Sequence, residues 1–407
     1  MGQANGAVPP AISVNPWWAT FAGLCASLVG IGLARFAYTP LIPALIEAEW
    51  FGPSAVAYLG AANLAGYLAG SLSAAWIAAR VPSAVVLRAM MLLAVVTFFA
   101  SAVPVSFLWF FVWRFASGLA GGVLMVVAAT AVLAHVPPSR RGLAGGAIFT
   151  GVGLGVAASG TLIPVLLEKG LTVTWLGLGA VSLVLTVAAW GGWPRETPVR
   201  PIPQPGLQPV VTPRHSQSRP PLALKALYAE YTLCALGLVP HMIFLVDFIA
   251  RGLGQGVDVG ARYWVLFGLG AIVGPMLGGY LADRIGFAAA VRLGFLAQAV
   301  AVAMLTVWSS ALGLIVSTVL IGVFLPGILP IVLGRVLELT PPDGPMRKAA
   351  WGHATTAFAL GQAAGAYGYS YLFARGGSYE LLFAFGAGAL LLAVVIDLFV
   401  AVLTRRR

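Results

Sequence analysis

Long apolar runs alternate with short polar segments along almost the whole chain. Crossing the hydrocarbon of a membrane takes about 20 apolar residues as a helix, because every backbone N–H and C=O must be paired where water is absent. The sequence therefore predicts an all-α membrane protein with membrane-spanning helices at roughly residues 17–43, 55–79, 84–103, 107–134, 141–167, 171–193, 224–250, 260–282, 288–308, 311–339, 347–374 and 379–403.

One long polar segment divides these twelve runs into six and six. It is rich in proline and carries four arginines, so it favours neither helix nor burial, and we expect a linker. The predicted organisation is an N-terminal tail (1–16), a six-helix bundle (17–193), the linker (194–223), a second six-helix bundle (224–403) and a basic tail (404–407).

The two halves repeat each other at a fixed offset. The repeated residues Gly66, Gly70, Ala79-Arg80, Gly118 and Pro137-Pro138 recur 204 positions later as Gly270, Gly274, Asp283-Arg284, Gly322 and Pro341-Pro342. A duplicated apolar chain of this length indicates a transporter built from two repeats.

Composition and charge agree with a surface that faces lipid. Hydrophobic residues make up 60% of the chain and charged residues 9%, whereas soluble proteins carry roughly a quarter charged residues. The net charge of +11 comes from basic residues in short loops rather than from a patch, which argues against nucleic-acid binding. The chain has no cluster of His, Cys or carboxylates with metal-ligand spacing, so we expect neither a metal nor another cofactor.

Lys and Arg also predict the orientation, because they resist translocation when they lie in short loops. Sixteen of the 23 basic residues fall on the side of the linker and both termini. The other side has only Lys169, Arg251, Arg262 and Arg375. We therefore expect the linker and both termini to be cytoplasmic.

Four stretches carry a resemblance to a known family. They are Gly279 to Gly286 (GYLADRIG), Arg114 with the glycines at 118, 121 and 122, the run Gly151, Gly153, Gly155, Ser159 and Gly160, and Gly30 to Pro40 (GIGLARFAYTP). With two six-helix repeats and a central linker, they resemble the major facilitator superfamily (MFS) from about Trp17 to the end of the chain. The stretch from Gly30 looks like that of the bacterial YbfB/YjiJ-type subgroup.

The resemblance implies an MFS fold of two pseudo-symmetric six-helix bundles in the bacterial inner membrane, monomeric, with a small-molecule substrate in a central cavity. It also implies that the predicted spans 55–79, 260–282 and 347–374, which carry small-residue faces, form the seam between the halves, and that smooth seams permit rocking. Those faces are Gly66, Gly70 and Ala74, then Gly270, Gly274 and Gly278, then Gly361 and Gly365. The alternative is static packing.

The loop from Gly279 to Gly286 implies a latch on the cytoplasmic side. Asp283 is expected at the N-terminus of the eleventh predicted span, 347–374, near Arg347, because the N-terminus of a helix favours an anion. Arg284 is expected to pair with Glu338. These contacts would hold the cytoplasmic side shut while the outer side is open; the alternative is a salt bridge with no gating role.

Charges inside the membrane are the sharpest indication of a site, because each costs roughly 2.5 to 3.5 kcal/mol at a helix centre. Arg35, Arg114, His241 and Asp247 lie in helices that line the cavity of the superfamily. Two arginines against one carboxylate favour an organic anion, since a guanidinium matches carboxylate or phosphate. Further candidates for substrate contacts are the stacking face of Phe36 and the polar groups of Tyr38, Asn63, Tyr67 and Gln362.

Two alternatives remain open for these charges. Arg35 and Arg114 either bind substrate or pair with Asp247 or with carbonyl groups, and Asp247 either lies in the cavity or lies beside Arg251. Asp247 and His241 are the candidates for proton coupling. Asp397, late in the last span, is expected to reach the interface or pair with Arg405.

The leading functional hypothesis is uptake of an organic anion with protons by alternating access. Proton-coupled efflux of sugars or drugs competes with it, although helix five lacks the Gly-Pro associated with antiporters. Two other classes are an integral membrane enzyme, for which no nucleophile with a base is evident, and a non-transporting sensor.

Overall fold

The computed structural model describes residues 15–133, 135–137, 141–194, 221–341 and 345–405, and every regular element in these residues is helical. The helices are α1 Pro16–Ser27, α2 Tyr38–Glu47, α3 Pro53–Ala78, α4 Ser83–Ala100, α5 Phe107–Leu133, α6 Arg141–Leu167, α7 Leu171–Ala189, α8 Leu222–Asp247, α9 Val257–Ile285, α10 Phe287–Val307, α11 Ala311–Glu338, α12 Pro345–Gly376 and α13 Tyr379–Arg405, with π-helical turns η1 Leu28–Leu33 and η3 Phe248–Gly252. Most of the predicted linker and the outer parts of both tails lie outside the described residues, so their boundaries stay predictions.

The predicted spans are confirmed as helices. Eleven segments in the described part of the chain are long and apolar enough to cross a membrane, and the first of them, Pro16–Glu47, combines α1, η1 and α2. The remaining predicted span, 347–374, is α12, a helix of 32 residues whose sequence is more polar than the others. The chain is thus an all-α membrane protein of twelve spans.

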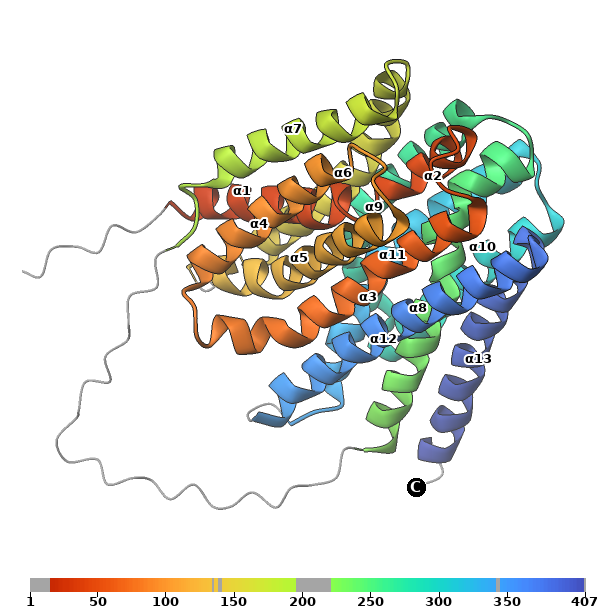
Figure 1. Ribbon diagram of the computed structural model, residues 1–407. Coiled ribbons are helices and arrows are strands. Elements are labelled where there is room, and N and C mark those ends of the chain that lie inside the picture. The colour runs from red at the N-terminus through yellow and green to blue at the C-terminus, as the bar shows by residue number, and fades with distance from the viewer. Residues whose placement is uncertain (1–14, 134, 138–140, 195–220, 342–344, 406–407) are drawn as a thin grey trace, which may run out of the picture.

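The spans pack as two bundles in the order expected from the repeat (Figure 1). In the first bundle α3 packs on α5, α1 on α6, and α4 on α7, and in the second α9 packs on α11, α8 on α12, and α10 on α13. Two equivalent pairs join the bundles, α6 with α9 and α12 with α3. We call the end at which α7 ends and α8 begins the linker face, and the opposite end the far face.

The repeat extends to the contacts between backbones. A Cβ on Gly118 would lie 1.8 Å from the carbonyl oxygen of Asn63, and a Cβ on Gly322 would lie 2.4 Å from that of Phe267. Both members of the second pair stand 204 positions after those of the first. Close approach of these helices requires glycine, because no side chain fits between backbones in such contact.

The prediction that the spans 55–79, 260–282 and 347–374 form the seam between the halves is confirmed, because α3 packs on α12 and α9 packs on α6, but the glycines singled out on them face the inside of each bundle. Gly66 and Gly70 pack on α5, Gly270 and Gly274 pack on α11, and Gly361 packs on α8, so these faces hold each bundle together internally. At the seam, a Cβ on Gly153 would lie 2.6 Å from the backbone nitrogen of Ile272, and one on Gly268 would lie 2.4 Å from that of Ala157. Spacing alone could not show which neighbour each glycine faces. On α6, for example, Gly151 faces Leu24 of the first bundle and Gly153 faces Ile272 of the second.

Candidate functional site

The first span is broken where the intramembrane charges begin. The π-helical turn Leu28–Leu33 is followed by the turn residues 34–37, and α2 starts at Tyr38. The break coincides with close helix contact: a Cβ on Gly32 would lie 2.7 Å from the Cα of Gly155. π-helical turns inside helices often mark functional sites, and broken spans are tolerated where neighbouring helices pair the freed backbone groups.

Arg114 and Ser117 of α5 supply that pairing. Both donate to the carbonyl oxygen of Ala34, over 2.9 Å from Arg114 Nη1 and 2.8 Å from Ser117 Oγ. Asn63 Nδ2 in turn donates to the carbonyl of Arg114 at 3.2 Å. Arg114 and Asn63 therefore hold the break in place, which is the carbonyl-pairing alternative for Arg114.

Arg35 lies on the break itself and has no such partner. Its guanidinium carbon lies 5.1 Å from the ring centre of Phe36 and 5.0 Å from that of Tyr67. Within the described residues its one polar contact is a weak one of 3.9 Å, from Nη2 to the sulfur of Met242. The buried Nε has no hydrogen-bond partner, and no carboxylate in the described part of the chain pairs with Arg35. Arg35 is half-buried, so its charge is held by aromatic faces and stays available to an anion.

From the second bundle, Met242 and Gln362 lie near the guanidinium of Arg35. Gln362 Nε2 lies 3.6 Å from the sulfur of Met242, so one thioether contacts both Arg35 and Gln362. The Oε1 of Gln362 and the hydroxyl of Tyr231, whose ring packs on that of Phe358, are buried and have no hydrogen-bond partner among the described residues. The sequence reasoning missed Met242 and Tyr231. It looked for charges inside the spans and passed over the thioether and hydroxyl groups of the seventh predicted span, 224–250.

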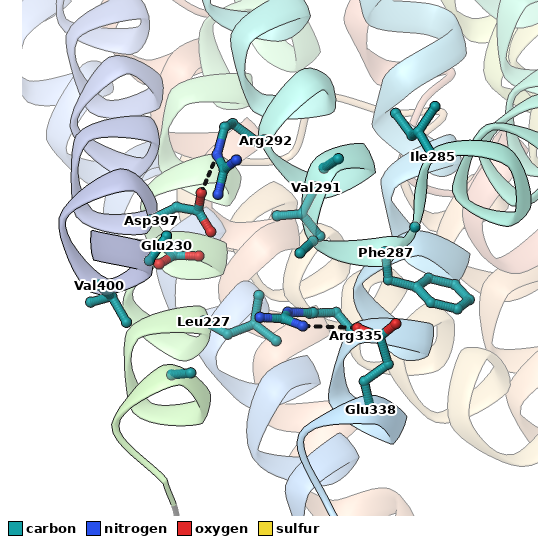
Figure 2. Close-up of a pocket in the computed structure, with 15 residues that line it drawn as sticks. Leu227, Glu230, Ile285, Phe287, Val291, Arg292, Arg335, Glu338, Asp397 and Val400 are labelled. Carbon is teal, nitrogen blue, oxygen red and sulfur yellow. Dashed lines mark hydrogen bonds and ion pairs between the residues drawn. The ribbon is translucent and has the colours of Figure 1, made fainter. Parts of the chain in front are cut away.

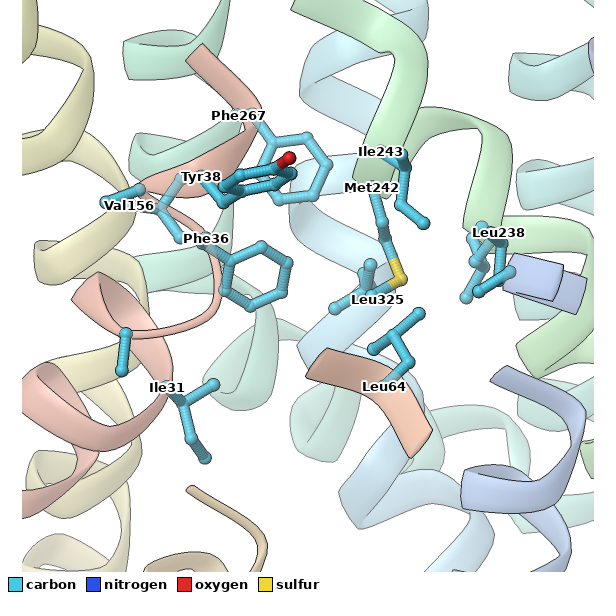
Figure 3. Packing of buried hydrophobic residues seen from close by; sticks show 14 of the residues in the cluster. Ile31, Phe36, Tyr38, Leu64, Val156, Leu238, Met242, Ile243, Phe267 and Leu325 are labelled. Atoms are coloured by element: carbon cyan, nitrogen blue, oxygen red, sulfur yellow. The ribbon is translucent and has the colours of Figure 1, made fainter. Parts of the chain in front are cut away.

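On the far-face side of Arg35 the two bundles are in direct contact. Phe36 lies 6.0 Å from Trp264 and 6.4 Å from Phe267, measured between ring centres. Figure 3 shows Phe36 and Tyr38 packed toward Met242, with Leu64 and Leu325 beside its sulfur. Tyr38 donates to the carbonyl of Val56 at 2.9 Å, and its ring covers the guanidinium of Arg114 at 4.1 Å. On this side of Arg35 the two bundles thus meet through apolar and aromatic side chains, which close the space between them toward the far face.

A hydrogen bond between the bundles strengthens this closure. Thr39 Oγ1 of α2 donates to the carbonyl oxygen of Met242 of α8 at 2.6 Å. We expect Thr39→Val, which keeps the shape and removes the donor, to cost the closed form about 1 kcal/mol, or roughly fivefold in its population. The measurement is cross-linking of cysteines placed at Tyr58 and Tyr367, whose rings lie 6.3 Å apart across the bundles.

The matched control for this variant is Thr97→Val. Thr97 donates only to the carbonyl of Ala94 in its own helix, at 2.7 Å. Equal cross-linking in the Thr39 and Thr97 variants would contradict a role for the Thr39 bond in closure.

Asp247 and His241, the two candidates for proton coupling, have partners other than Arg35 and Arg114. Asp247, at the far-face end of α8, accepts from Arg251 Nη1 at 3.2 Å and from the hydroxyl of Tyr379 at 2.5 Å, which is the expected alternative of a carboxylate beside Arg251. His241 points into the second bundle, with Nε2 2.9 Å from Ser317 Oγ and its ring 5.2 Å from that of Phe383. The structure therefore does not bring His241 to Arg35.

The loop residues of the implied latch are spread over the linker face. Arg284 stacks on Tyr280 at 4.9 Å, and Glu338 pairs with Arg335 of its own helix at 2.8 Å. Gly286 ends α9 with φ +82°, a backbone conformation that suits glycine, and a Cβ on Gly279 would meet nothing within 4 Å. The side chain of Arg347 lies outside the described residues. A latch that closes the linker face should be open when the far face is closed, so the pairing of Arg284 with Glu338 stays a prediction.

A charged residue that the sequence reasoning overlooked lies near the linker face. Glu230 of α8 is 3% exposed and lines a cavity with Arg292, Arg335 and Asp397. Asp397 pairs with Arg292, and the side chain of Arg405 lies outside the described residues. The signal was present in the sequence, because Glu230 is the only carboxylate in the first half of the seventh predicted span.

Comparison with known families agrees with this architecture. The family model described as "Uncharacterised MFS-type transporter YbfB" matches residues 27–398. A search of curated proteins found no match to the chain. The matched range begins just before the break in the first span and ends in α13.

Proposed function

The chain belongs to the YbfB-type family of major facilitator superfamily transporters, and from this premise we propose that it carries a small organic anion, together with protons, across the membrane. Membrane transport follows from the family, whereas the substrate class and the coupling ion are the proposal. We further propose that the protein acts as a monomer in the bacterial inner membrane with the linker face toward the cytoplasm, and that it is not an enzyme.

One observation carries the choice of an anion: Arg35 presents a guanidinium without a carboxylate partner at the break between the bundles. A buried or half-buried charge is costly unless it is paired, and the aromatic faces of Phe36 and Tyr67 offset only part of that cost. A carboxylate or phosphate on the solute would supply the missing pair with two parallel hydrogen bonds. Arg35, Phe36, Tyr67, Gln362 and Tyr231 are the proposed substrate contacts.

Alternating access is supported by the way the bundles touch. α2 and α8 are in contact, and of the two seams, α6 with α9 and α12 with α3, the first carries small residues at close approach. Bundles that meet through smooth seams can rock about a site between them. In this proposal the structure represents the form closed to the outside.

The test is counterflow in proteoliposomes, in which an unlabelled solute inside drives entry of its labelled form. We expect organic carboxylates or phosphates to exchange, and to accumulate further when the outside is made acidic. Sugars and cationic dyes in the same panel serve as controls for solute class. Exchange of sugars or dyes alone would overturn the proposal of an anion, and exchange of no solute would overturn transport.

A further inference from the structure

A cavity of about 400 Å³ opens at the linker face of the second bundle, away from Arg35 (Figure 2). Its walls come from α8, α10, α11 and α13 and from the turn between α9 and α10. Five charged side chains line it, namely Glu230, Arg292, Arg335, Glu338 and Asp397. Three carboxylates therefore share the cavity with two guanidinium groups.

Both guanidinium groups already have carboxylate partners. Arg292 Nε pairs with Asp397 Oδ2, and Arg335 Nη1 donates to Glu338 Oε2 at 2.8 Å. Figure 2 shows these two pairs at different levels of the cavity, with the carboxylate of Glu230 beside Asp397. The fifth charged group, Glu230, is left over.

Glu230 is the most enclosed of the three carboxylates. It is 3% exposed, whereas the side chains of Asp397 and Glu338 are 14% and 42% exposed. No hydrogen bond or ion pair to Glu230 occurs in the described part of the chain. A carboxylate that is enclosed, has no donor and lies beside another carboxylate is costly in its charged form.

The charged and titratable groups around Glu230 come from each neighbouring helix. Arg292 lies on α10, Arg335 and Glu338 on α11, and Asp397 on α13. On the α12 side the described titratable residue is His353, whose ring lies 6.1 Å from that of Tyr228, and α8 itself contributes the exposed Lys225. Each guanidinium that could neutralise Glu230 is already paired with Asp397 or Glu338.

We propose that Glu230 is the proton-binding site of the protein and takes its proton from water at the linker face. The proton passes from a hydronium ion to a carboxylate oxygen: one O–H bond of the hydronium ion breaks and leaves water, and one O–H bond forms on Glu230, which becomes a neutral acid with a donor for its neighbour Asp397. A metal ion fits less well, because two guanidinium groups share the cavity and no metal-binding group of three ligands occurs in the described residues. The coupling role of this proton rests on the proposed function; the binding of the proton does not.

The position of Glu230 links its protonation to the substrate contacts through α8. Glu230 and Met242 lie on the same helix, 12 residues or about 18 Å apart, with Pro240 between them. When Glu230 is charged it competes for Arg292 or Arg335 and ties α8 to α10 and α11. When it is neutral this tie is released, so the linker-face half of α8 is free to move relative to its neighbours while Met242 stays beside Arg35.

The first test uses the proton itself as the probe. Infrared difference spectra of the purified protein in liposomes, recorded across a pH titration, should contain a carboxylic-acid C=O band that Glu230→Gln removes. Glu168→Gln, which changes an exposed carboxylate between α6 and α7, should leave the band in place. The same titrating band in wild type and in folded Glu230→Gln would overturn the proposal.

A second variant covers the case in which Glu230→Gln does not fold. Glu230→Asp keeps the acid on a shorter stem and should retain a titrating band at an altered frequency; an unaltered band would count against Glu230. Transport then tests the coupling role separately: Glu230→Gln should keep counterflow and lose accumulation driven by an acidic outside. Accumulation at the wild-type level would overturn coupling through Glu230, whereas absent counterflow in wild type would overturn the transport function and leave the infrared result standing.

Discussion

Arg35→Ala is expected to reduce anion counterflow by about 100-fold. The guanidinium is the one intramembrane cation near the centre that no carboxylate or carbonyl of the described residues occupies. Removing one partner of an enclosed, hydrogen-bonded charge pair typically costs about 2 to 5 kcal/mol. Since each 1.4 kcal/mol is about a factor of ten, a cost near 3 kcal/mol gives the expected loss. The measurement is the initial rate of counterflow with an anion that the wild type exchanges.

Two variants make this result specific. Arg375→Ala removes a guanidinium that stacks on the exposed Tyr371 at 4.6 Å, and it should leave counterflow unchanged. Arg35→Lys keeps the charge but loses the planar fork of donors, so its rate should fall between those of wild type and Arg35→Ala. Because Arg35 contacts only the rings of Phe36 and Tyr67 and, weakly, the sulfur of Met242, and no ion pair holds it within the described residues, its removal should leave folding intact. Wild-type counterflow in a folded Arg35→Ala protein would end the anion-site proposal.

Gly118→Ala is expected to lower the stability of the first bundle by about 3 kcal/mol, the upper part of the usual range for overpacking. The added Cβ would lie 1.8 Å from the carbonyl oxygen of Asn63, so α3 and α5 must separate. That separation would also disturb the bond from Asn63 to Arg114, and with it the support of the Ala34 carbonyl. The measurement is the melting temperature of detergent-solubilised protein, followed by size-exclusion chromatography after heating.

Two further glycine-to-alanine variants test this prediction, one at the equivalent position of the repeat and one at a glycine with open space around it. Gly322→Ala, 204 positions later, would place its Cβ 2.4 Å from the carbonyl oxygen of Phe267 and should destabilise the second bundle in the same way. Gly388→Ala on α13 would meet nothing within 4 Å and should be neutral. If Gly118→Ala melted at the same temperature as Gly388→Ala, close packing of α3 on α5 would be refuted.

The helices were predictable from the sequence because length and apolarity alone decide whether a segment can span a bilayer. The first predicted span, 17–43, and the observed Pro16–Glu47 agree in this sense. The break inside it was not predictable. It depends on contacts of Gly32 with Gly155, and on donors from Arg114 and Ser117, all of which come from other helices.

The candidate site was predictable only in part, because a residue's type does not tell which way its helix turns it. The cost of a charge in the membrane pointed to both Arg35 and Arg114. The sequence did not show that Arg114 donates to the carbonyl oxygen of Ala34. His241 faces Ser317 inside the second bundle, which the sequence cannot show. Glu230 escaped attention because it lies near the start of its span, although its burial depends on α10, α11 and α13 closing around it.

The polarity of α12 has a consequence for how the protein is made. A helix gains free energy on entering lipid in proportion to its apolar side chains, and α12 is the span that falls short of the others in this respect. α12 packs on α8 and α3, and its polar residues Gln362 and Ser370 are buried. We therefore expect α12 to enter the membrane stably only once α3 and α8, which precede it in the chain, offer it a protein surface.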